Sequence, residues 1–107
     1  MDSVAKRNVS DILMKVIDAA PGVHKRTTSY YTTNENRPVS PQEFEVWMRF
    51  VHSVVDQTSK DTGLDAFQMV KLEIAQIENQ STLTIEQKIQ HISSTIANLT
   101  RWFMQNA

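Results

Sequence analysis

The residues best suited to chemistry in this chain lie in and around a run of basic, hydroxyl and aromatic side chains between positions 24 and 37. Lysine and arginine neutralise phosphates, hydroxyl groups bond to them, and tyrosine rings stack on unpaired bases. One hypothesis is therefore that this segment contacts nucleic acid, together with basic residues earlier in the chain. The candidate nucleic-acid-binding residues are Lys6, Arg7, Lys15, His24, Lys25, Arg26, Tyr30, Tyr31 and Arg37.

The alternative interpretation is that this run forms a solvated loop or a protein contact. The whole chain has a formal net charge of −1, whereas dedicated nucleic-acid binders are usually basic overall. Polar, mildly basic loops also arise from the needs of solubility alone. The charge of the chain therefore favours the second interpretation.

Patterns typical of catalysis or of metal binding do not occur in the sequence. Only two glycines are present, Gly22 and Gly63, so a glycine-rich phosphate loop is excluded. No G-x-S-x-G motif exposes a serine nucleophile. The histidines, His24, His52 and His91, lack the spacing of a helical zinc site, and cysteine is absent. We expect a protein that is not an enzyme and that needs no metal or cofactor.

Charged residues near the beginning of the chain interrupt every apolar run. Lys6, Arg7, Asp11 and Lys15 exclude the apolar core of a secretory leader. No stretch reaches the roughly 20 apolar residues of a membrane span. We therefore expect an intracellular, cytoplasmic protein that does not bind membranes.

Helices are the main structural elements that the sequence predicts. Apolar residues recur at intervals of three and four, while glycine and proline stand only at the breaks between these stretches. The pattern predicts an all-α fold with a single helical domain over residues 1–107: antiparallel helices from residues 40–106 plus an N-terminal helix joined by a long polar loop. The predicted elements are a helix over 3–20, a loop or extended arm over 21–40, and helices over 41–60, 65–79 and 84–106.

Capping signals support these helix starts. Ser40, Pro41 and Glu43 have the types and spacing of an N-cap, a first helical residue and a capping box. Asp65 and Gln68 show the same spacing, and Ser3 is the predicted cap of the first helix. We further expect Leu64 and Met69 to form a hydrophobic staple.

Several apolar residues fall outside the stripes that face the predicted core. In the last helix the steps of four and three give a heptad seam, with Trp102 and Met104 beside it. An irregular bundle in which the first helix covers such residues is one interpretation. An association surface is the other, because aromatic residues and methionine are enriched in interfaces. The candidate partner-interface residues are Val46, Phe50, Met69, Leu72, Trp102 and Met104.

The sequence therefore favours a non-catalytic oligomeric interaction protein: an adaptor, inhibitor, chaperone or assembly subunit that acts through apolar helical surfaces. We expect a homo-oligomer, most simply a dimer, or a helical protein partner. The loop over 21–40 is long enough for the first helix to pack on its own chain or to cross to a second subunit. The alternative is a small nucleic-acid-binding protein, nucleocapsid-like or RNA-sequestering, that uses the basic loop.

Overall fold

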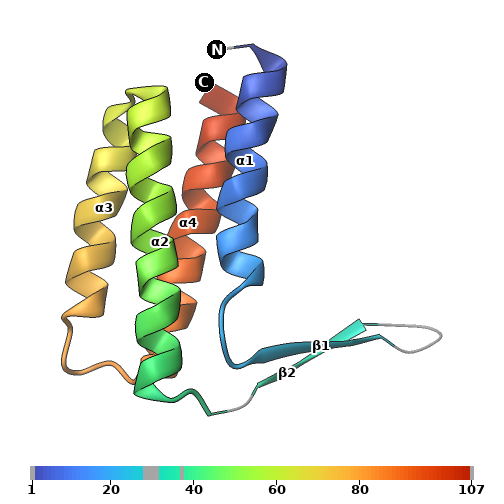
Figure 1. Cartoon of the computed structure of the whole chain (residues 1–107), viewed down its shortest axis with the longest axis vertical. Helices are drawn as coiled ribbons and strands as arrows, with labels where there is room; N and C mark the ends of the chain where they lie inside the picture. Colours follow the sequence, from blue (N-terminus) through green and yellow to red (C-terminus); the bar gives the residue numbers. More distant parts are fainter. Residues whose placement is uncertain (1, 28–31, 37, 107) are drawn as a thin grey trace.

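The chain folds into four helices and a projecting two-stranded hairpin in the computed structural model (Figure 1). The structure describes residues 2–27, 32–36 and 38–106, with the backbone alone for the two strands. The predicted all-α, four-helix arrangement is confirmed. Its elements are α1 (Ser3–Asp18), β1 (Val23–Thr27), β2 (Thr32–Asn36), α2 (Pro41–Thr62), α3 (Asp65–Glu78) and α4 (Ile85–Asn106).

The four helices form a bundle in which successive helices run in opposite directions (Figure 1). Helix α1 packs against α2 and α4 within its own chain, and α3 also packs against α2 and α4. Helices α1 and α3 therefore lie at opposite edges of the bundle, as Figure 1 shows. The short links between the last three helices account for their antiparallel order.

The core lies along the heptad seam of α4. Phe103 is fully buried and meets the ring of Phe67 from α3 edge to face, with 5.7 Å between ring centroids. From α1, Leu13 and Val16 complete this core and are also fully buried. The buried seam residues of α4 are Ile89, Ile92, Ile96, Leu99 and Phe103.

Helix α2 begins and ends as its sequence dictates. The hydroxyl oxygen of Ser40 accepts from the amide of Glu43 at 3.2 Å, and the Glu43 carboxylate accepts from the Ser40 amide at 3.2 Å. These two bonds form the predicted capping box. The helix ends at Thr62 and is capped by Gly63, whose φ of 64° suits glycine because the left-handed region penalises a Cβ atom.

The helices α1 and α3 begin at the predicted residues, but their two predicted caps are wrong. Asp2, not Ser3, caps α1: its carboxylate accepts from the Ala5 amide at 2.8 Å. Leu64 occupies the cap position of α3 without a side-chain bond, because the short link after Gly63 draws Leu64 against the core. Asp65 consequently becomes the first helical residue. Met69 is 69% exposed and forms no staple.

The helix ends differ from the predicted ones by one or two residues. Helix α1 stops at Asp18, where Ala19 caps it through bonds to the carbonyls of Lys15 and Ile17. Helix α2 continues past Lys60 to Thr62, while α3 and α4 are each one residue shorter at one end.

The arm between α1 and α2 contains an antiparallel hairpin. Its register pairs Val23 with Asn36 and Thr27 with Thr32. The hairpin extends away from the bundle (Figure 1), and the described strand residues pair with each other without contacting a helix. Two-stranded hairpins alone are only marginally stable in water.

Among the described residues, no helix combines the length and apolar character that a membrane crossing requires.

Candidate interaction surface

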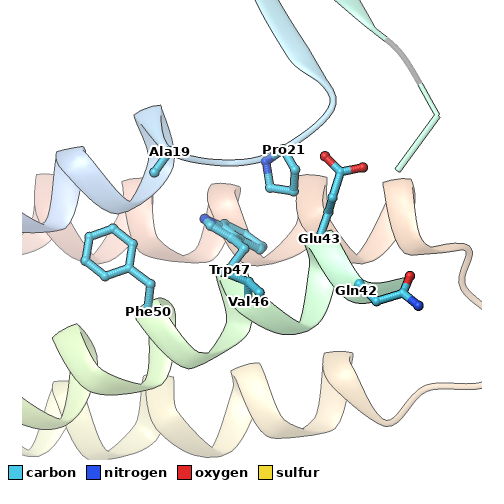
Figure 2. Close-up of a pocket in the computed structure, with 7 residues that line it drawn as sticks. All are labelled: Ala19, Pro21, Gln42, Glu43, Val46, Trp47 and Phe50. Carbon is cyan, nitrogen blue, oxygen red and sulfur yellow. The ribbon is translucent and has the colours of Figure 1, made fainter. Parts of the chain in front are cut away.

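An apolar hollow lies between the end of α1 and the first turns of α2. We call it the α1–α2 groove; its volume is about 570 Å³. Figure 2 shows the side chains of Trp47 and Phe50 directed from α2 toward Ala19 and Pro21. The groove is lined by Ala19, Pro21, Gln42, Glu43, Val46, Trp47 and Phe50.

Trp47 lines this groove, and a hydrogen bond holds its ring in place. Its indole Nε1 donates a buried hydrogen bond of 2.9 Å to the carbonyl oxygen of Val16 in the last turn of α1. This bond joins the two helices and satisfies a polar atom that burial would otherwise leave unpaired. Ala19, opposite the ring, carries only a methyl group, so the space beside the indole stays open to solvent. Pro21, which follows α1, is the last residue that lines the groove on that side.

The polar residues of the groove stand at the start of α2. Glu43 is engaged there, because its carboxylate accepts from the Ser40 amide in the capping box. Val46 is 61% exposed and Phe50 is 39% exposed, so most of the remaining lining is apolar and reachable by a partner. Burial of apolar side chains is favourable by roughly 25 cal/mol for each Å² removed from water. The groove can therefore bind apolar side chains, and it offers no reactive group.

A second hollow of about 300 Å³ lies between α3 and α4. We call it the α3–α4 groove. Met69 and Trp102 belong to its lining and are 69% and 40% exposed. On its polar side, the Thr95 hydroxyl donates to the Glu73 carboxylate at 3.5 Å. Its lining residues are Ala66, Met69, Val70, Glu73, Thr95, Asn98, Leu99 and Trp102.

The six predicted partner-interface residues are all exposed, but they do not form one surface. Two of them line the α1–α2 groove and two line the α3–α4 groove. Leu72 on α3 and Met104 on α4 are exposed and line neither of these hollows. Helix α1 packs beside α2 without covering Val46 or Phe50.

The apolar groove residues that were not predicted as interface residues are Ala19, Pro21 and Trp47. Pro21 and Ala19 look like helix-terminating features, and Trp47 belongs to the predicted core stripe. Their common role depends on the placement of α1 beside α2, which periodicity does not report. The available signal was the large apolar residue on each side of Trp47 in the same helix: Val46 precedes it and Phe50 follows it.

The structure separates the basic residues named by the nucleic-acid hypothesis. Lys6 and Arg7 lie in the first turns of α1, at the end of the bundle remote from the hairpin, and Lys15 lies in its last turn (Figure 1). His24, Lys25 and Arg26 follow one another on β1. Tyr30, Tyr31 and Arg37 lie outside the described residues.

Ionisable groups elsewhere join helices to one another. His52 of α2 lies 3.1 Å from the Glu78 carboxylate of α3. The Lys71 ammonium lies 2.7 Å from the Asp56 carboxylate, and this hydrogen bond lowers the pKa of Asp56. In the described part of the chain, no cluster of three or more acidic, histidine or cysteine side chains could hold a metal ion.

A comparison of the chain with models of protein families, with curated proteins and with solved structures finds no match.

Proposed function

We propose that this protein is a non-catalytic interaction protein that self-associates through its apolar helical surfaces. The observation that carries the proposal is the α1–α2 groove, a hollow of about 570 Å³ whose exposed lining includes Val46 and Phe50. Fully burying a valine, leucine or phenylalanine side chain is worth roughly 1.5–3 kcal/mol. Contiguous apolar surface of this kind marks contact sites in proteins.

Exposed apolar residues outside the groove support the same function. Met69 and Leu72 on α3 are each about two-thirds exposed, and Trp102 and Met104 lie on α4. Aromatic residues and methionine are enriched in interfaces because they bury a large apolar area or adapt to irregular surfaces. A second molecule that covered these side chains would remove them from water.

Sedimentation velocity from micromolar to millimolar concentration tests the proposal. We expect the mass to rise with concentration, and a double variant, Val46→Glu with Phe50→Glu, to weaken association at least tenfold, because two charges would enter the groove. The matched control, Gln90→Glu with Gln105→Glu, adds two charges to exposed positions on α4 outside both grooves. A wild-type protein that stayed monomeric throughout would refute self-association.

A second candidate function is nucleic-acid binding by the arm. It is supported by the succession of His24, Lys25 and Arg26 on a strand that extends from the bundle. Phosphate contacts of this kind weaken steeply as salt rises. Retention on immobilised RNA should then fall with salt and with the double change Lys25→Ala and Arg26→Ala. Retention that neither change affects would rule out the arm as an RNA site.

A further inference from the structure

Helix α1 alone among the described helices is joined to the bundle by a long connection. Residues 19–40 separate it from α2, whereas short links join α2 to α3 and α3 to α4. The ring of Phe67 on α3 meets that of Phe103 on α4, a core contact that does not involve α1. Helices α2, α3 and α4 therefore form a unit that α1 completes.

The contacts by which α1 completes this unit are all non-covalent. Its Leu13 and Val16 side chains are fully buried, and the Trp47 indole of α2 donates to the Val16 carbonyl at 2.9 Å. An identical α1 from a second copy of the chain would make the same contacts. Exchange of an identical element is a low-cost route to a dimer, because the native contacts are kept.

The hairpin between α1 and α2 has a register that such an exchange would also keep. Its described residues pair with each other and contact no helix. Val23 pairs with Asn36 at one end, and Thr27 pairs with Thr32 at the other. If the arms of two copies straightened and lay antiparallel, β1 of one chain would meet β2 of the other with the same partners. The backbone bonds lost on opening each hairpin would be regained between the chains.

The two ends of the arm are fixed, so the part that can straighten is well bounded. At the end near α2, Val39 is buried and its amide donates to the Glu86 carboxylate of α4 at 3.2 Å. At the end near α1, Ala20 packs against the core, and its amide donates to the Ile17 carbonyl at 3.1 Å. The hinge of an exchange therefore lies between Ala20 and Val39.

We infer that two copies of this chain exchange α1, with the hairpin as the hinge, so that α1 of each copy completes the bundle of the other. The inference rests on the proposed function, self-association, and assigns it to the buried face of α1. A straightened segment over residues 23–36 is about 46 Å long at 3.3 Å per residue. The two bundles therefore stand apart at the ends of a two-stranded ribbon, and each α1–α2 groove is lined by both chains.

A pair of introduced cysteines tests the exchange. The chain has no cysteine of its own, and Lys25 stands opposite Asn34 in the hairpin register. Opposite residues of antiparallel strands have Cα atoms about 4.5–5.5 Å apart, within the reach of a disulfide. The double variant Lys25→Cys with Asn34→Cys is refolded from urea at millimolar concentration and then oxidised. We expect a disulfide-linked dimer on a non-reducing gel, because the paired positions then belong to different chains.

The same variant oxidised in dilute solution should close the disulfide within one chain. This closed hairpin cannot straighten, so the protein should remain monomeric when it is concentrated, and reduction followed by refolding should restore the dimer. Asn34→Cys alone is the matched control: it cannot close the hairpin and should dimerise as the wild type does. Circular dichroism checks that every variant keeps its helices.

The outcomes separate this inference from the proposed function. A closed-hairpin protein that associates as strongly as the wild type, or a concentrated sample that forms disulfides only within chains, would overturn the exchange while self-association stood. A wild-type protein that is monomeric even after refolding at millimolar concentration would overturn both. A linked dimer that survives Val46→Glu with Phe50→Glu would support the exchange and show that self-association does not need the groove.

Discussion

Helix α1 packs against its two neighbours in different ways. On the α4 side, Leu13 and Val16 are fully buried among seam residues that repeat at every turn. On the α2 side, Trp47 bridges the two helices and the space beside Ala19 remains open. A regular seam closes the first side, whereas one large ring opposite one small side chain leaves the second side open.

Neighbouring residues of one helix therefore serve separate purposes. Trp47 is buried and bonded to α1, while Val46 beside it is 61% exposed. The closed side stabilises the bundle because its apolar area is already removed from water. The open side retains apolar area whose burial could drive association.

The first prediction compares the loss of stability when a phenylalanine ring is removed at two different places. Phe103→Ala in the core, on the helix α4 that closes the first side, should destabilise the fold by about 3–5 kcal/mol, because it removes a fully buried ring and its contact with Phe67 of α3. Phe50→Ala on the open side should cost about 1 kcal/mol or less, since part of that ring is already in water. Urea denaturation measures both losses. Equal losses would show that the α1–α2 groove is as closely packed as the core.

The next effect concerns the hydrogen bond from Trp47 to Val16, which joins α2 to α1 on the open side. Trp47→Phe keeps an aromatic ring but removes the donor to the Val16 carbonyl, so it should cost about 1–3 kcal/mol. Amide exchange in the last turn of α1 should accelerate because that turn loses its link to α2. Trp102→Phe, at an exposed position of α4, is the control and should change stability much less. Unchanged exchange in α1 would show that the ring alone holds the helices together.

The helices could be predicted from the sequence because their signals are local. The steps of four and three from Ile85 to Phe103 determine which face of α4 is buried, and the Ser40–Glu43 box determines where α2 begins. Both features involve residues within one helix. Val46 and Met69 lie outside the stripes, but the sequence left open whether another element covers them, and the predicted staple of Met69 was wrong.

The groove could not be predicted, because it depends on the distance between two helices. Nothing in the periodicity of α1 indicates that Ala19 stands opposite Trp47. The predicted cap of α3 was wrong for a related reason: the spacing of Asp65 and Gln68 matched a capping box, but the short link at Gly63 places Leu64 at the cap. Tertiary packing decided both cases.

A third effect separates a working cap from an apparent one. Ser40→Ala should cost about 0.5–2 kcal/mol, because the Glu43 amide loses its acceptor at the start of α2, beside the α1–α2 groove. Asp65→Asn should cost about 0.5 kcal/mol or less, since Asp65 lies inside the first turn of α3 and interacts with the helix dipole alone. Thermal unfolding ranks the two variants. A larger loss for Asp65→Asn would mean that this carboxylate caps α3 in solution.

The smallest effect lies on the α2–α3 side, at one of the polar pairs that join these two helices. Asp56 and Lys71 are half-exposed, so water screens their attraction, and Asp56→Asn should cost about 0.5 kcal/mol or less at neutral pH. The Lys71 hydrogen bond lowers the pKa of Asp56 in the folded state below its unfolded value. The contribution of the pair is therefore complete above the unfolded pKa and is lost as the pH falls through the folded pKa. Urea denaturation of both proteins between neutral and acidic pH measures it: their stabilities should converge in acid, and a difference that grew there would contradict the lowered pKa.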